Sequence, residues 1–203
     1  KKNEALHSRI IVMPIPYNLR VSEEERIYEK MIRESDVADV HIAPHTLRIA
    51  AMFTILTRLK ESKRPDVDLL KKMRLYDGEM IEGFNEVDVE ELKKEHPDEG
   101  MSGIDPRYVI NRISACIIRK EVPSINALDV LRSLKEGLDQ HPSISKEDRE
   151  RYLNFISLVR KEYDEIAKQE VQKAFVYSYE ESAKTLMNNY LDNVEAYCNK
   201  TKL

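Results

Sequence analysis

HIAPHTLRIAAMFTILTRLK, residues 41–60, is the stretch that decides the fold class of this chain. Pro44 is suited to the first turn of a helix, where a missing backbone N–H costs nothing. The apolar side chains that follow are too dense for one narrow stripe: Leu47, Ile49, Ala50, Ala51, Phe53, Ile55, Leu56 and Leu59. A helix that is apolar over so much of its surface must be buried on more than one side. We therefore expect a buried helix here.

Helical signals continue on both sides of this stretch. The chain has only 5 Gly and no Trp in 203 residues, and it is rich in good helix formers. Apolar periodicity and capping residues predict about eight helices. Ser124 is expected to cap one of them, and the last third is expected to form two helices, 145–176 and 179–197. The apolar run 10–16 predicts at most a short strand near the N-terminus, so the expected fold class is all-α, with many helices.

The domain organisation is predicted from one compositional change. Residues 77–103 hold four of the five glycines and are strongly acidic, which favours a connecting segment on the surface. The expected divisions are residues 1–76, the connecting segment 77–103 and a second helical region, 104–203.

Composition and missing motifs exclude several classes of protein. The net charge is -4 with no separate basic patch, so nucleic-acid binding is not expected. No apolar run approaches the roughly 18 residues of a membrane span, and the two cysteines have no metal-binding or redox spacing. These features predict a cytoplasmic protein. The chain begins at Lys1 rather than Met, and it has no GxxxxGK[ST] loop, so we expect a segment of a longer protein that is inactive by itself.

Two arginines are the candidate site residues. Arg9 precedes an apolar run, and Arg48 lies one turn into the buried helix. A guanidinium is permanently charged and can donate two parallel hydrogen bonds to a phosphoryl group. The alternative is that both arginines are ordinary solvated or salt-bridged residues, with Asp36 or Glu29 as possible salt-bridge partners. No metal site is predicted, because Pro44 separates His41 from His45 and prevents them from sharing a helix face.

Four segments resemble one protein family, the PrkA serine protein kinases of bacteria. They are NEALHSRIIVMPIPYNLRVSEEERIYEKMI (3–32), HIAPHTLRIAAMFTILTRLK (41–60), MRLYDGEMIEGF (73–84) and DEGMSGIDPRYVINRIS (98–114). The first is similar to the end of that family's AAA+ ATPase core, the second to its helical lid, and the others to the region after the lid. The resemblance implies that residues 1–76 end the AAA+ module and that residues 104–203 are an incomplete part of the PrkA C-terminal region.

The family resemblance also implies a function for the longer protein. It would be an ATP-dependent serine protein kinase that uses ATP and Mg, phosphorylates a protein substrate on serine, acts as a homo-oligomer, and is linked to stress and sporulation. Arg9 would be the arginine finger offered to a neighbouring subunit, and Arg48 the lid arginine, called sensor 2, that contacts nucleotide. No cofactor is expected on this segment alone, because the phosphate-binding loop and the Mg-binding acidic motif would precede Lys1.

Two other functions stay open at this point. The longer protein could be an AAA+ remodelling ATPase or a component of an ATP-dependent protease instead of a kinase. The segment could also be a helical regulatory or interaction module without chemistry, in which case the loss of Arg48 would leave ATP turnover intact.

Overall fold

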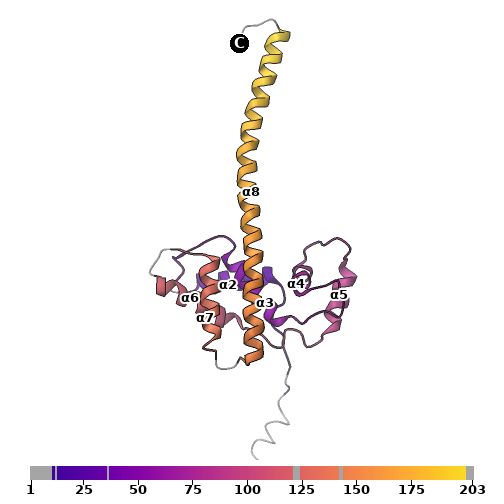
Figure 1. Cartoon of the computed structure of the whole chain (residues 1–203), viewed down its shortest axis with the longest axis vertical. Helices are drawn as coiled ribbons and strands as arrows, with labels where there is room; N and C mark the ends of the chain where they lie inside the picture. Colours follow the sequence, from indigo (N-terminus) through magenta and orange to yellow (C-terminus); the bar gives the residue numbers. More distant parts are fainter. Residues whose placement is uncertain (1–10, 12, 36, 121–123, 142–143, 200–203) are drawn as a thin grey trace, which may run out of the picture. The chain divides into compact units, whose positions relative to one another are not determined.

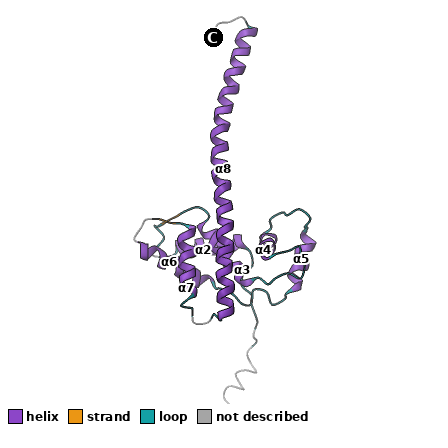
Figure 2. Cartoon of the chain, viewed as in Figure 1, coloured by secondary structure: helices purple, strands orange, loops and turns teal. Residues whose placement is uncertain are grey.

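The computed structural model describes residues 11, 13–35, 37–120, 124–141 and 144–199. Its elements in chain order are α2 (Val21–Arg33), β1 (His41–Ile42), α3 (Thr46–Arg58), α4 (Leu69–Asp77), α5 (Glu86–Glu95), α6 (Pro106–Lys120), β2 (Ser124–Ile125), α7 (Ala127–Leu138) and α8 (Lys146–Cys198). Helices account for most of the described chain (Figure 2). The expected all-α class is therefore confirmed, with one very small sheet.

The chain divides into two compact units, residues 1–160 and residues 161–203. In the first unit α3 is central, with α6 and α7 on one side and α4 and α5 on the other (Figure 1). Every residue of α3 from Ile49 to Arg58 is buried. The dense apolar pattern of residues 47–59 therefore predicted the burial of this helix correctly, because several neighbours surround it.

Helix α2 packs against α3 through an apolar face and several polar contacts, one of them between two hydroxyl groups. The hydroxyl groups of Tyr28 and Thr54 lie 2.7 Å apart in a buried hydrogen bond. Thr54 also donates to the carbonyl of Ala50, one turn earlier. Both hydroxyls are satisfied inside the core, which removes most of the cost of burying them.

The two strands form a parallel pair that joins distant parts of the first unit. His41 pairs with Ser124 and Ile42 with Ile125, and the Ala43 amide donates to the Ile125 carbonyl at 2.9 Å. The sequence had predicted a strand within residues 10–16 instead. Ile10 and Val12 lie outside the described residues, and residues 13–16 form neither helix nor strand. The pairing of β1 with β2 joins residues that are far apart in the sequence and leaves no local periodicity, so the sequence pattern could not predict this sheet.

Two helix boundaries differ from the predicted ones. Ser124 belongs to β2 instead of capping a helix, and Asn126 is the N-cap of α7, where its side chain accepts from the Asp129 amide. Residues 145–176 and 179–197 were predicted as separate helices, but α8 is continuous. Its sequence contains no Gly or Pro that would stop a helix, so the predicted break was wrong.

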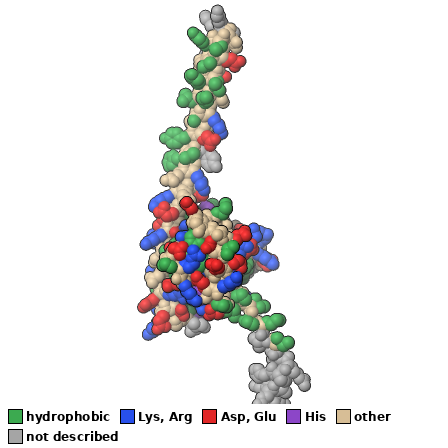
Figure 3. All heavy atoms as spheres, turned by 90° about the vertical axis from the view of Figure 1, so that its right-hand side faces the viewer, with side chains coloured by type: hydrophobic (Ala, Val, Ile, Leu, Met, Phe, Trp, Pro, Cys, Tyr) green, Lys and Arg blue, Asp and Glu red, His purple; other side chains and the backbone are tan. Residues whose placement is uncertain are grey.

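The second unit is the part of α8 that follows Arg160, together with the residues after it. All side chains described between residues 168 and 195 are exposed. Large apolar side chains are among them, and some are visible along this helix in Figure 3. Phe175, Leu186 and Tyr197 recur at intervals of 11 residues and are 63%, 73% and 86% exposed. An 11-residue spacing keeps them on nearly one line along the helix surface.

Candidate functional site

Arg48, the predicted lid arginine, lies among three carboxylates in the first unit. Its guanidinium is 3.1 Å from a Glu79 oxygen, 3.5 Å from an Asp77 oxygen and 4.0 Å from a Glu25 oxygen. The Arg48 side chain is 31% exposed, whereas that of Asp77 is 6% exposed. The structure therefore places this arginine in a partly solvated cluster with an excess of negative charge.

The carboxylates come from α2, from the end of α4 and from the loop that follows α4, which explains why sequence spacing did not reveal them. Glu25 is on α2, and Asp77 is the last residue of α4. Asp77 also accepts a 2.7 Å hydrogen bond from the Ser22 amide, so it satisfies a backbone donor in the first turn of α2. Gly78, with φ of 89°, ends α4 in a left-handed conformation and directs the chain to Glu79.

Burial is the main influence on the pKa of Glu25. Partial burial of the Glu25 carboxyl raises its pKa, and the nearby Arg48 guanidinium only partly opposes this effect. The charged form of Glu25 is therefore disfavoured in the folded state relative to an exposed glutamate.

Replacing Glu25 with glutamine tests this electrostatic account. A folded-state pKa above the unfolded value makes the Glu25 contribution to stability fall as pH rises from the unfolded pKa through the folded one. The stability of Glu25→Gln relative to the wild-type chain is therefore expected to increase from about pH 4 to about pH 7. Urea denaturation at both pH values measures it, with Glu23→Gln on the exposed side of α2 as the control. A relative stability that decreases over this interval would contradict the account.

The other predicted site residues are not brought together with Arg48. Arg9 lies outside the described residues, as does Asp36. Glu29, the second partner considered for an arginine, does not contribute to the Arg48 cluster, which is formed by Glu25, Asp77 and Glu79. The proposed contacts of Arg9 and Arg48 with nucleotide stay predictions.

A buried ion pair that the sequence pattern did not single out lies at the other end of α3. Arg58 donates to both carboxylate oxygens of Glu24 at 2.8 Å, and both side chains are 0% exposed. The same guanidinium donates to the Ile104 carbonyl from Nε at 3.0 Å and to the Asn18 carbonyl at 2.9 Å. The ring of Tyr17 lies 4.7 Å from the guanidinium carbon. The only sequence signal for this ion pair was the presence of a charged residue, Arg58, inside the apolar run 47–59.

A second buried pair lies beside it. The Lys72 ammonium is 2.7 Å from a Glu99 oxygen, and it also donates to the Lys60 carbonyl at 3.0 Å. Tyr76 donates to the other Glu99 oxygen at 2.9 Å, and burial together with this carboxylate holds the pKa of the phenol far above its ordinary value. Arg58 and Lys72 thus attach the segment 99–104 to α3 and α4 through buried charges.

A cavity of about 610 Å³ adjoins the Arg48 cluster at Glu79. Its charged lining residues are Glu79, Glu86 and Glu90, with Arg20 and Lys93. Three carboxylates make this cavity a poor environment for nucleotide phosphates. In the part of the chain that the structure describes, no group of three or more His, Cys, Asp and Glu side chains is arranged to hold a metal ion. Within the same ranges, no helix has the length and apolar composition needed to cross a membrane.

Comparison with known families matches nearly the whole chain. Residues 1–66 match the family described as PrkA AAA domain, and residues 70–203 match the one described as PrkA serine protein kinase C-terminal domain. The buried Arg58 pair joins these two matched regions, because Glu24 and Arg58 lie in the first and Ile104 in the second. No solved structure matches the chain.

Two curated relatives bear different functional names. The chain is 85% identical over all 203 residues to "ATP-dependent protease PrkA" of Bacillus subtilis, and it covers 32% of that protein. It is 32% identical over 202 residues to "Serine/threonine kinase YeaG" of Escherichia coli K12. The matched stretch covers 94% of this chain and 30% of that relative. The chain thus spans about a third of the length of these relatives. From the match over residues 70–203, it belongs to the PrkA serine protein kinase family.

Proposed function

We propose that this chain is the lid and following helical region of an ATP-dependent PrkA-type enzyme that phosphorylates a protein substrate on serine. In this proposal residues 1–76 end the AAA+ module, residues 77–103 connect, and residues 104–203 belong to the C-terminal region. ATP and Mg bind to the longer protein, which acts in the cytoplasm as a homo-oligomer with Arg9 directed at a neighbouring subunit. The chain by itself is inactive.

The observation that carries the proposal is the buried connection between the two family-matched regions. Arg58 on α3 is bonded to Glu24 on α2 and to the backbone of Ile104 at the same time. These groups are desolvated, so loss of the Glu24 contact would leave a buried charge unpaired, and loss of the Ile104 contact would leave a buried carbonyl without its donor. A displacement of α3 by nucleotide is therefore expected to move the segment at Ile104 as well. This supports a role in passing the nucleotide state to the C-terminal region.

Arg48 provides the nucleotide contact in this proposal. Of its ion pairs, the one with Glu79 is the easiest to replace by a contact with phosphate. The Glu79 side chain is 44% exposed, and ion pairs with solvated partners are weak. A phosphate offers more negative charge and a matching bidentate geometry. When the lid closes, the guanidinium leaves Glu79 for the phosphate oxygens.

The decisive experiment is Arg48→Ala in the full-length protein. ATP turnover is expected to fall by about tenfold or more, because a charge-assisted hydrogen bond to phosphate contributes about 1.5–3 kcal/mol. The fold should survive, since the Arg48 side chain is already 31% exposed. Initial rates of phosphate release measure the effect, and thermal melting checks the fold.

The matched control is Arg26→Ala on α2. Its side chain is 72% exposed and pairs only with Glu23 at 3.1 Å among the described residues, so turnover should not change. If Arg48→Ala turns over ATP as fast as Arg26→Ala, Arg48 has no nucleotide role and the chain is better described as a helical regulatory module.

A second function is favoured by the name of one relative. Because the 85% identical protein is called an ATP-dependent protease, the full-length protein could use ATP to drive proteolysis instead of serine phosphorylation. Incubation of full-length protein with a protein substrate and ATP labelled on the γ-phosphate separates the two. Label on serine supports the kinase, whereas free labelled phosphate with loss of intact substrate supports the protease.

A further inference from the structure

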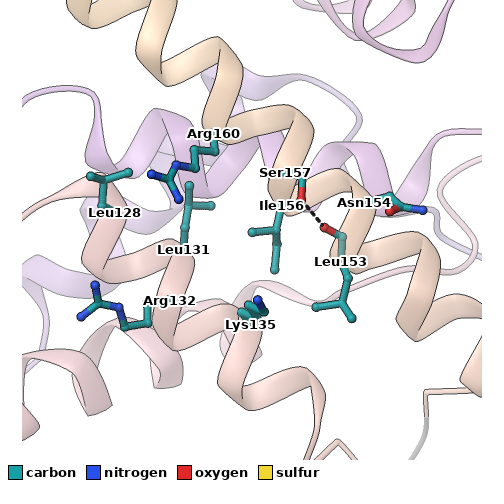
Figure 4. Close-up of a pocket in the computed structure, with 9 residues that line it drawn as sticks. All are labelled: Leu128, Leu131, Arg132, Lys135, Leu153, Asn154, Ile156, Ser157 and Arg160. Atoms are coloured by element: carbon teal, nitrogen blue, oxygen red, sulfur yellow. Dashed lines mark hydrogen bonds between the residues drawn. The ribbon is translucent and has the colours of Figure 1, made fainter.

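An open cavity of about 420 Å³ lies between α7 and the first four turns of α8 (Figure 4). We call it the α7–α8 groove. Its lining residues are Leu128, Leu131, Arg132, Lys135, Leu153, Asn154, Ile156, Ser157 and Arg160. All of them belong to the first compact unit. The volume lies in the range of about 300–1,000 Å³ that is usual for binding pockets.

The floor of the groove is apolar. Leu131 and Ile156 are 4% and 8% exposed and belong to the core, whereas Leu128 is 39% exposed at the edge. The Ser157 hydroxyl donates to the Leu153 carbonyl of its own helix, so it offers its hydrogen to no ligand. The floor can therefore accept apolar side chains, and it has little to offer a polar ligand.

Three cations surround this floor: Arg132 and Lys135 come from α7, and Arg160 from α8. No carboxylate is among the described residues that line the groove. All three side chains are exposed. Among the residues that the structure describes, these three cations form no ion pair, although cations elsewhere on this chain commonly do. A net positive, apolar depression on a chain of net charge -4 calls for an anionic partner with an apolar face.

The placement of the charges indicates what kind of anion fits. In Figure 4 the guanidinium groups of Arg132 and Arg160 and the amine of Lys135 lie apart, around the leucines, and do not converge on one point. One phosphate could not contact all three. Several carboxylates spaced along a segment could. A hydrophobic groove lined by helices is a common binding site for an amphipathic helix.

We propose that the α7–α8 groove binds an acidic amphipathic helix of a partner protein. Leucine-like side chains of the partner enter the cavity above Leu131 and Ile156. Flanking aspartate or glutamate side chains pair with Arg132, Lys135 and Arg160. The proposal is separate from ATP use, because it involves neither Arg48 nor the buried Arg58 connection.

The test measures binding of a fluorescent peptide to the 203-residue chain by anisotropy, without nucleotide. The probe is a peptide of about 15 residues, long enough to approach a stable helix, with Leu on one face and Glu beside it. The expected result is saturable binding that weakens as NaCl rises from about 0.05 M to about 0.5 M. The double variant Arg132→Glu with Lys135→Glu is expected to weaken binding by about tenfold or more.

Two kinds of control make the result specific. Lys93→Glu with Lys94→Glu on α5 causes the same change in net charge at exposed positions outside the groove, and it should leave binding within about twofold. The milder pair Arg132→Gln with Lys135→Gln should give an intermediate loss, and thermal melting confirms that each variant is folded. A peptide with Lys in place of Glu, or Ser in place of Leu, should not bind.

Several outcomes would overturn the proposal. They are no saturable binding of the Leu–Glu peptide, equal losses in the α5 and α7 double variants, or equal binding of the Ser-substituted peptide. A single-stranded DNA oligonucleotide, or vesicles of anionic lipid, that bound with the same dependence on Arg132 and Lys135 while the peptide did not would identify a general polyanion surface instead.

Discussion

Glu24→Ala is expected to lower the free energy of unfolding by about 3–5 kcal/mol, because it leaves the Arg58 guanidinium buried without its carboxylate. Both side chains are 0% exposed in the folded chain, so water cannot replace the lost partner without opening the core. The remaining bonds of Arg58 to the Ile104 and Asn18 carbonyls do not neutralise its charge. Urea denaturation followed by circular dichroism measures the loss.

The adjacent residue provides the control. Glu23 pairs with Arg26 on the surface, with side chains 43% and 72% exposed, so Glu23→Ala should cost under about 1 kcal/mol. Replacing both partners, as Glu24→Leu with Arg58→Met, should recover part of the loss, because no charge is then left unpaired. Recovery stays incomplete, since two backbone carbonyls lose their donor. If Glu24→Ala costs no more than Glu23→Ala, the pair is not essential to the core.

The second large effect is expected at Gly103, where the chain passes close to the end of α3. Its φ of 117° favours glycine, and an added Cβ would lie 2.7 Å from Arg58 Cγ and 2.9 Å from the Thr57 carbonyl oxygen. Backbone atoms of a buried helix cannot give way as the end of a flexible side chain would. Gly103→Ala is therefore expected to destabilise the fold by about 3 kcal/mol, from backbone strain and overpacking together.

Gly83→Ala separates these two causes. Gly83 also has a positive φ, 83°, but no atom of the described residues lies within 4 Å of its added Cβ. Its substitution should cost only the left-handed conformation, about 1–2 kcal/mol. The difference between the two variants in midpoint and slope of urea denaturation reports the close approach at Gly103. Equal losses would mean that the segment at Gly103 moves away from Arg58 without cost.

The comparison of α3 and α8 explains how far the sequence could predict this fold. Helix α3 was predicted well because its burial follows from its own composition. The predicted break in α8 was wrong because no Gly or Pro stops the backbone near residue 177. Periodicity describes which face of a helix is apolar, whereas helix ends depend on backbone and capping chemistry.

The site residues illustrate a different limit. Arg48 could be singled out, because an arginine in a dense apolar segment is unusual. Its partners Asp77 and Glu79 could not, since they lie at the end of α4 and just after it, about 30 residues along the chain. The family resemblance suggested a role for Arg48 but described none of its contacts. The cations of the α7–α8 groove were also missed, because each one by itself is an ordinary exposed residue.

The amino-acid sequence by itself determined the helical class, the burial of α3 and the PrkA resemblance, because propensity, local apolar density and motif content are properties of neighbouring residues. Only the tertiary structure decided that Glu24 and Arg58 form a desolvated pair, that Gly103 lies against Thr57, and that β1 meets β2. Each of these contacts joins segments distant along the chain, and its energy depends on the exclusion of water, which exists only once the helices have packed.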